Sequence, residues 1–228
     1  MKLMPEYLYA NLALRHSGCW TEFTVYDYYD TLVSVEYSTF NILKANRISI
    51  VRRSKYESKS KLKQVLDHDS SIMDYDFSNL ISTNKYTVYS IFMLQDVNST
   101  VIGKLKSRGI IVLNATVRNG IEYYDIISND NIKIVVDDLL KIDDRIKIVN
   151  LYFSNLDEKN LFKAISRNIG NVMFTEKEQM LIKKAEELGY FDSPRKKNLD
   201  EFARELGVSK MNISLRLRNV LKKIHNLI

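Results

Sequence analysis

The fold of the carboxyl-terminal part of this chain is decided by residues 198–224, NLDEFARELGVSKMNISLRLRNVLKKI. Asn198 is a typical N-cap residue, and Glu201 three residues later completes a capping signal for a short helix. Gly207 can adopt a positive φ angle, and Ser209 can cap a second, longer helix. The stretch therefore predicts a short helix, a three-residue turn and a longer helix, which is the helix-turn-helix layout.

The longer helix, expected over residues 209–224, has two dissimilar faces. One face is an apolar arc at helical spacing, formed by Ile213, Leu217, Val220 and Ile224. We expect this arc to pack on Phe202 and Leu206. The opposite face combines amides, cations and large apolar side chains, which suit adenine edges, guanine or phosphate, and thymine methyl groups. We therefore expect the helix to lie in the major groove of DNA, and a helix that binds only protein is the alternative.

The expected DNA-binding residues of this helix are Ser209, Lys210, Met211, Asn212, Ser214, Leu215, Arg216, Arg218, Asn219 and Lys222. Residues 207–228 contain five cations and no acid, and such a positive field favours phosphate. Charge alone would equally suit a solvated helix face. A second cationic group follows Pro194, at Arg195, Lys196 and Lys197. This group either contacts backbone phosphate as a wing-like loop or is a solvated loop.

Another helix precedes this pair. Thr175 and Glu178 have the spacing of a capping box, and Gly189 is a typical helix terminator. The side chains at core spacing between them are Met180, Leu181, Ala185 and Leu188. Three helices with apolar faces are enough to form a small core of their own.

Two segments that precede the helix-turn-helix extend the pattern to a known family. FTEKE at 174–178 leads to LGYFDSPR at 188–195, and LDEFARELGVSK follows at 199–210. Together they closely resemble the helix-turn-helix of archaeal bacterio-opsin-activator-like regulators over about 50 residues. The resemblance implies a transcription regulator in which residues 210–218 enter the major groove. The first 155 residues match that family only in general plan, so the resemblance implies no effector.

Composition and charge agree with a folded DNA-binding protein. The chain has 228 residues, 45% of them hydrophobic and 27% charged, with a net charge of +6. This mixture excludes a mainly disordered chain, and the single cysteine excludes a disulfide framework and a four-cysteine zinc site. The sequence has no apolar run long enough to cross a bilayer and no signal peptide. We expect a cytoplasmic protein that makes no membrane contact.

The first 154 residues predict a repeated order of elements. Strand, helix, strand, strand, helix, strand is expected over about 1–80 and again over about 84–154, and Asn119-Gly120 is the preferred turn of a two-residue hairpin. Val33, Val35 and Tyr37 share one face of an early strand, and Met73, Tyr75 and Phe77 share one face of a later one. The first helix is expected at 19–29.

We therefore expect an α+β fold of two tandem ferredoxin-like (βαββαβ) modules, similar in plan to ACT-type sensing domains. These modules would form a sensor or dimerisation region over 1–154. A connector helix at 155–173, capped by Asn155 and Glu158 and ended by Gly170, would lead to the helix-turn-helix domain at 174–228. The connector's apolar stripe would pack within the subunit or on a second subunit.

Other candidate sites carry weaker signals. Cys19 lies at the start of the helix expected at 19–29, a position that can lower a thiol pKa and suits a redox sensor. His16 lies at a metal-like spacing from Cys19. Without a third ligand, packing is the simpler interpretation, so we expect no cofactor and no metal. The acid pairs Asp137-Asp138 and Asp143-Asp144 have no accompanying nucleophile or phosphate loop, so no catalytic residues are expected.

The sequence thus favours a non-enzymatic, DNA-binding transcription regulator. We expect a homodimer on double-stranded DNA, because one recognition helix buries too little surface for tight binding, and control by a small-molecule effector or a partner at the amino-terminal region. Two alternatives remain open. One is a metabolite-sensing protein whose basic tail binds a protein partner, and the other is an RNA-binding protein that uses its ferredoxin-like sheets.

Overall fold

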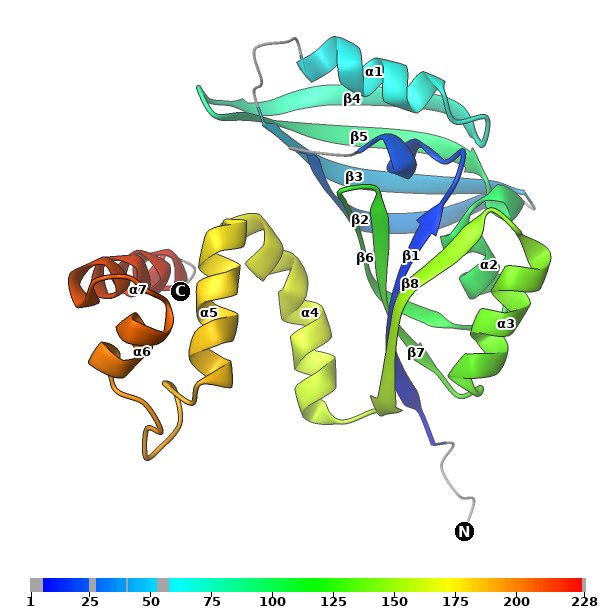
Figure 1. The fold of residues 1–228 in the computed structure, drawn as a ribbon. Helices are drawn as coiled ribbons and strands as arrows, with labels where there is room; N and C mark the ends of the chain where they lie inside the picture. The colour runs from blue at the N-terminus through cyan, green and yellow to red at the C-terminus, as the bar shows by residue number, and fades with distance from the viewer. Residues whose placement is uncertain (1–5, 25–27, 40, 53–57, 227–228) are drawn as a thin grey trace. The chain divides into compact units, whose positions relative to one another are not determined.

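A large antiparallel β-sheet forms the amino-terminal part of the computed structural model, and helices form the rest (Figure 1). The structure describes residues 6–24, 28–39, 41–52 and 58–226. The chain divides into two units, residues 1–165 and 166–228. The strands are β1 (Leu8–His16), β2 (Tyr28–Thr39), β3 (Ile42–Arg52), β4 (Ile72–Ser82), β5 (Tyr86–Asp96), β6 (Ile111–Arg118), β7 (Ile121–Ser128) and β8 (Ile146–Asn155).

Helical segments connect these strands in the expected places. They are the 3-10 turns η1 (Trp20–Phe23) and η2 (Val97–Ser99) and the helices α1 (Ser58–Asp67), α2 (Val101–Ser107) and α3 (Ile132–Ile142). The helix α4 (Glu158–Met173) follows β8, and the remaining helices belong to the second unit. The α+β class, the twice-repeated order of elements and the helical carboxyl-terminal domain are confirmed.

The strands form a single sheet in the order β4-β5-β3-β2-β6-β7-β1-β8. The sheet consists of two four-stranded halves. We name β4, β5, β3 and β2 the first half-sheet, and β6, β7, β1 and β8 the second half-sheet. The halves meet where β2 pairs with β6, from Tyr29 opposite Arg118 to Thr31 opposite Thr116.

The half-sheets exchange a strand with each other. In a ferredoxin-like module, the first strand of the module lies between its third and fourth strands. Here β5, the first strand of the second repeat, lies between β3 and β4 of the first repeat. In the same way β1 lies between β7 and β8 of the second repeat. The order of elements could be predicted from local patterns, whereas this exchange is a property of long-range pairing.

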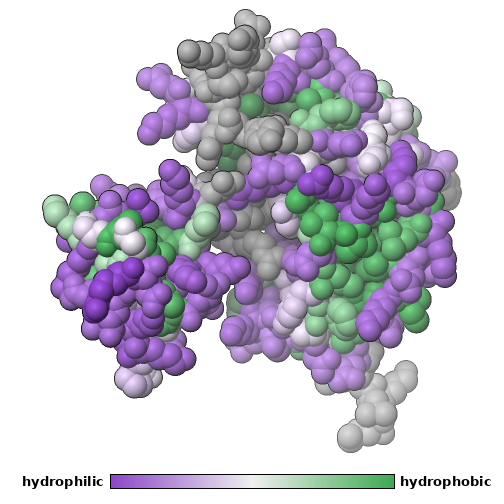
Figure 2. Space-filling view, viewed as in Figure 1, coloured by the Kyte–Doolittle hydropathy of each residue, from purple (hydrophilic) through white to green (hydrophobic). Residues whose placement is uncertain are grey.

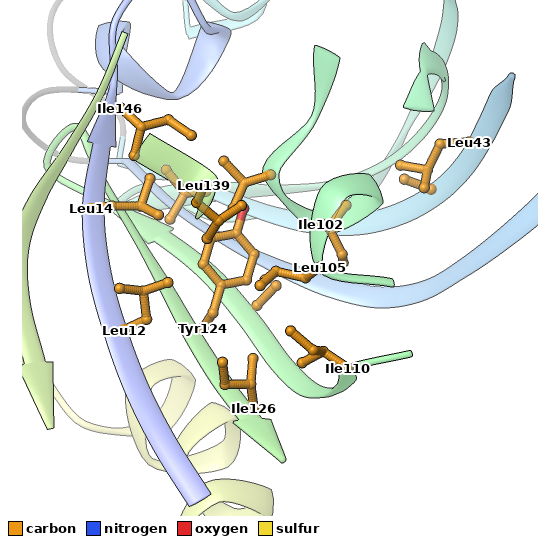
Figure 3. Close-up of a cluster of buried hydrophobic side chains, with 14 of the residues drawn as sticks. Leu12, Leu14, Leu43, Ile102, Leu105, Ile110, Tyr124, Ile126, Leu139 and Ile146 are labelled. Carbon is orange, nitrogen blue, oxygen red and sulfur yellow. The ribbon is translucent and has the colours of Figure 1, made fainter. Parts of the chain in front are cut away.

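One apolar core serves both half-sheets. It joins side chains from strands, η1 and all three helices α1, α2 and α3. Figure 3 shows part of it, where Leu12 and Leu14 of β1 lie near Tyr124 and Ile126 of β7, with Leu105 of α2 beside them. Because every one of these elements contributes to the same core, the first unit is a single packed structure.

The hairpin between β6 and β7 has the predicted turn. Asn119 has a φ angle of 53° and Gly120 one of 72°, as a two-residue turn with positive φ at both positions requires. Arg118 pairs with Ile121 directly across the turn. The turn therefore sets the register of β7 and with it the position of Glu122 in this strand.

The predicted helix over 19–29 is wrong. Among the described residues of this range only the short turn η1 is helical, and Tyr28 already belongs to β2. The Thr24 hydroxyl donates to the Thr21 carbonyl oxygen (2.7 Å) at the end of η1, and the aromatic and β-branched residues that follow favour a strand. Residues 25–27 lie outside the described residues, as do the side chains of Val33, Val35 and Tyr37 whose shared face was predicted.

Three smaller expectations also differ from the structure. Met73 is exposed, because the register of β4 shifts between Ile72 and Asp74. Asn155 ends β8, and the cap of α4 is Asp157, whose carboxylate accepts from the backbone N–H of Asn160 (2.6 Å). The helix α4 also continues beyond Gly170 to Met173. A glycine is tolerated inside a helix at a cost of about 1 kcal/mol.

None of the helices in the described part of the chain combines the length and apolar character that a membrane crossing needs.

Candidate nucleic-acid interface

Three complete helices lie in the second unit, and each begins at the predicted cap. They are α5 (Glu176–Glu187), α6 (Leu199–Glu205) and α7 (Lys210–His225). Thr175 with Glu178, and Asn198 with Glu201, form complete capping boxes. The Ser209 hydroxyl accepts from the backbone N–H of Asn212. Local hydrogen bonding thus fixes where each helix starts.

Glycines shape both connections of this unit. Gly207, in the turn between α6 and α7, has a φ angle of 62°, and Gly189, after α5, has one of 68°. A Cβ atom on Gly189 would lie 2.7 Å from the Cδ atom of Lys196. The linker therefore folds back closely over the end of α5, a path that only glycine permits at this position.

The buried side of α7 matches most of the prediction. Ile213, Leu217 and Val220 are buried, and the core of the unit is formed by Leu181, Ala185, Phe202, Ala203, Ile213 and Leu217. Leu206 packs at the edge of this core. Ile224 was expected in the same arc but is 39% exposed. It lies in the last turn of α7, and the short helix α6 spans only seven residues.

Met180 was expected in the core of α5 and is 71% exposed. Leu181 and Ala185 lie in the core, as expected. Leu188 is partly buried against the core, as expected. An apolar residue one position from a core residue points about 100° away from it on a helix, so sequence spacing alone assigned Met180 to the wrong edge of the buried face.

The opposite side of α7 is exposed, and it carries the residues expected to contact DNA. Met211 is 71% exposed and Leu215 is 47% exposed. The other exposed members are Ser209, Lys210, Asn212, Arg216, Arg218, Asn219 and Lys222, and Ser214 is half-buried. Figure 2 shows a mostly hydrophilic surface over the visible face of the helical unit. The predicted division of α7 into a core face and a polar face is present in the structure.

Some cationic side chains of this unit form ion pairs with acids of the same unit. The Lys210 Nζ atom lies 2.8 Å from an Asp200 carboxylate oxygen at the start of α6. Lys223 donates to Glu178 of α5 at 2.6 Å. Burial opposes ionisation of Glu178, but the hydrogen bonds from Lys223 and Thr175 outweigh it and hold the pKa of this carboxyl below its ordinary value. This contact fastens α7 to α5 away from the exposed face.

Arg216, Arg218 and Lys222 differ from these cations. All three are exposed, and among the described residues none of them forms a salt bridge or a side-chain hydrogen bond. Cations without internal partners keep their full charge for an external anion. The exposed face of α7 is therefore the side of this helix that presents unneutralised positive charge.

The linker that carries Arg195, Lys196 and Lys197 is held against the helical core. The Tyr190 ring stacks on the Phe202 ring at 5.3 Å, and the Arg195 guanidinium lies over the Tyr190 ring at 5.0 Å. Lys196 pairs with Asp192 at 2.8 Å, and Lys197 pairs with Glu205. These cations are exposed or half-buried at the surface, but each also has a partner inside the unit.

A core variant of α7 tests the assignment of its buried face. We expect Leu217→Ala to lower the free energy of unfolding by about 2 to 5 kcal/mol, because it leaves a cavity between α7 and α6. Urea unfolding of the full-length protein, followed by circular dichroism, measures this loss. Leu221→Ala is the control, since Leu221 is 63% exposed on the same helix and its loss should change stability by no more than about 0.5 kcal/mol. Equal effects of the two variants would contradict the assignment.

Outside this unit, the structure shows the partners of two of the paired acids, Asp138 and Asp143. Asp138 pairs with Arg108 at 2.7 Å near the surface. Asp143 is buried with His16, Lys104 and Arg145 around it. These contacts explain both acids as structural partners of cations.

Cys19 does not have the lowered thiol pKa that a redox sensor needs. Burial, together with the negative charges of Glu122 and Asp69, raises the pKa of the Cys19 thiol well above its ordinary value. Hydrogen bonds with Thr21 in η1 act in the opposite direction, but they are smaller than the effects of burial and the two carboxylates. The raised pKa and the contact of Cys19 with the core favour packing, the simpler interpretation of the sequence, over a reactive thiolate. Sequence reasoning missed Glu122, which lies beside Cys19 and His16.

Comparison with known proteins agrees with the geometry of the helical unit. Residues 174–226 match a family described as an HTH DNA binding domain, of the bacterio-opsin-activator type. The match spans α5, α6 and α7. No curated protein matches the chain. The match supports a DNA-binding regulatory role for the protein and points to a regulator rather than an enzyme.

Proposed function

We propose that this protein is a sequence-specific transcription regulator that places α7 in the major groove of double-stranded DNA. The exposed face of α7 carries this proposal, because it combines unneutralised cations with amides and large apolar side chains. In helix-turn-helix proteins the second helix reads base edges mainly with its amino-terminal residues. Asn212 and Arg216 would accordingly read bases, and Lys222 would contact phosphate.

The roles of the other proposed DNA-binding residues follow from where they lie on α7 and in the linker. Ser209, Lys210, Met211 and Ser214 lie in the first turns of α7, on or beside the side proposed to face the groove. Leu215 would contact a thymine methyl group, and Asn219 would lie beside Arg218. Arg195, Lys196 and Lys197 would add phosphate contacts by exchanging their internal partners for DNA, which costs little for exposed ion pairs.

We also propose that the protein acts as a homodimer in the cytoplasm. Exposed apolar side chains gather on the sheet unit, as Figure 2 shows over the part that Figure 1 assigns to α3 and β8. They include Ile134, Ile142, Val149, Tyr152 and Phe153. Phe162 and Ile165 of α4 are exposed too. A second copy of the chain would cover such a surface, and two copies would present two recognition helices.

The sheet unit over residues 1–154 would then couple dimerisation to an effector. Its two half-sheets share one core, so a ligand bound at one place would affect both. The helical unit over 174–228, reached through residues 155–173, would transmit the response to DNA.

Arg218→Ala tests the groove assignment. We expect this variant to bind a duplex, selected by the parent protein from a random pool, roughly 5- to 150-fold more weakly. Its melting temperature should not change, because Arg218 is exposed. Fluorescence anisotropy with the labelled duplex measures the affinity, and single-stranded RNA serves as competitor.

Arg15→Ala provides the matched control. It removes the same charge from an exposed position on β1, far along the chain from α7, and it should leave the affinity unchanged. If Arg218→Ala bound the selected duplex as tightly as the parent, the placement of α7 would be wrong. If single-stranded RNA displaced the duplex, the sheets would be the better candidate for the nucleic-acid surface.

A further inference from the structure

Three side chains with metal-binding groups meet at the end of β1. His16 ends that strand, Cys19 lies just before η1, and Glu122 lies on the adjacent strand β7. One ligand atom from each residue lies within 4.8 Å of the other two. His16 and Glu122 are 3% and 4% exposed, and Cys19 is half-buried. The cluster is thus enclosed on most sides.

Neighbouring residues form hydrogen bonds with the side chains of this cluster. Metal ligands in proteins are usually oriented by hydrogen bonds of this kind. The His16 Nε2 atom lies 3.1 Å from an Asp143 carboxylate oxygen, which leaves Nδ1 as the ring nitrogen available to an ion. Metal-binding histidines usually donate their other N–H to a carboxylate in this manner. Asp143 is itself fixed by Lys104 at 2.6 Å and by Arg145 at 2.8 Å.

Glu122 is oriented in the same way. Its two oxygens accept from the Thr21 hydroxyl at 2.6 Å and from the Tyr124 hydroxyl at 2.5 Å. Each carboxylate oxygen has further lone pairs, so these hydrogen bonds still allow coordination. A ligating carboxylate is normally held by such hydrogen bonds.

The donors of the cluster match the charge of a divalent ion. Cys19 would coordinate as a thiolate and Glu122 as a carboxylate, so these two ligands together would balance two positive charges. Binding would release the Cys19 proton to solvent.

We propose that His16, Cys19 and Glu122 bind one divalent transition-metal ion, for which zinc is the best match. Nitrogen, sulfur and oxygen donors together suit zinc and exclude the oxygen-only preference of Mg²⁺ and Ca²⁺. Ligand atoms around tetrahedral zinc lie roughly 3.5 Å apart, so binding needs side-chain shifts of about 1 Å. Three protein ligands leave one coordination position for water or a small ligand.

At this location a bound ion would act on the connection between the two half-sheets. The segment that contains Cys19 and η1 connects β1 of the second half-sheet to β2 of the first. Asp69, which follows α1, accepts from the Trp20 backbone N–H at 2.9 Å. Arg47 of β3 lies over the Trp20 ring at 4.9 Å, so the first half-sheet also contacts this crossing. An effector role for the ion rests on the proposed function, whereas ion binding itself does not.

Titration of the metal-free, full-length protein with Co²⁺ tests the site. The chain has a single cysteine, so a sulfur-to-cobalt charge-transfer band in the near ultraviolet can come only from Cys19. We expect this band, together with visible bands of a four- or five-coordinate ion, and we expect Zn²⁺ to abolish both. Cys19→Ser should remove the near-ultraviolet band, and Glu122→Gln should weaken Co²⁺ binding by about tenfold or more.

Two further variants serve as controls for the spectrum and for folding. His225→Asn changes a histidine on α7 and should leave the spectrum unaltered. Glu122→Asp keeps the carboxylate and should retain the bands if Glu122→Gln fails to fold, as judged by circular dichroism. The absence of the sulfur band in folded parent protein, or its persistence in Cys19→Ser, would overturn the proposal. DNA binding that stays intact in that case would leave the proposed function standing.

Discussion

The affinity of the full-length protein for duplex DNA should fall roughly 10³- to 10⁴-fold between 50 and 200 mM salt. Arg216, Arg218 and Lys222 are exposed and make no ion pair with any described residue, so two copies of α7 bring six unneutralised cations to the DNA. Each neutralised phosphate contributes about −0.9 to the slope of log affinity against log salt. Six to eight phosphates therefore predict a slope of roughly −5 to −7.

Anisotropy titrations at several KCl concentrations measure this slope. Removing one phosphate contact in each copy, through Lys222→Ala, should make the slope shallower by about 2. A titration at concentrations well above the dissociation constant should also reach saturation at two chains per duplex. A slope near zero would exclude α7 as a phosphate-binding surface, and a stoichiometry of one chain would exclude the dimer.

Asp143→Asn should lower the free energy of unfolding by about 3 to 5 kcal/mol. Asp143 is buried and accepts from Arg145, from the buried Lys104 ammonium and from His16. Removing the carboxylate leaves the Lys104 charge buried without its counterion, which is strongly destabilising. Asp144→Asn is the matched control, because Asp144 is the adjacent acid and is exposed. It should change stability by no more than about 0.5 kcal/mol.

The same network predicts a pH dependence. The hydrogen bond from Arg145, aided by Lys104, holds the pKa of Asp143 far below its ordinary value despite burial. The stabilisation is therefore complete above the ordinary aspartate pKa of about 4 and declines as the pH falls below it. Urea unfolding at pH 7 and at about pH 3 should show a smaller difference between the parent and Asp143→Asn at the lower pH. A difference that does not change with pH would contradict the role of the ionised carboxylate.

The helical unit could be predicted closely because its signals are local. Ser209 caps α7, and Gly207 allows the turn before it, through contacts within a few residues. Periodicity placed Ile213 and Leu217 in the core for the same reason. It failed for Ile224 because burial there depends on how far the neighbouring helix extends. That length is not encoded in α7 itself.

The cluster around Cys19 could not be assembled from sequence. Glu122 is distant from His16 and Cys19 along the chain, and only the pairing of β1 with β7 brings them together. One signal was present, since a carboxylate within a largely apolar strand usually has a buried partner. The partner itself depends on which strands are neighbours, and in this sheet the neighbours are exchanged between the repeats.

That exchange makes the two repeats mutually dependent for folding. A cut in the short connection between β4 and β5 would give one fragment with β1 but without β5, and another with β5 but without β1. Each fragment would lack the strand that fills the middle of its own half-sheet, and each would carry the strand that the other lacks. The pieces would therefore remain associated as complementary fragments, and neither repeat could evolve, unfold or respond to a ligand without its counterpart.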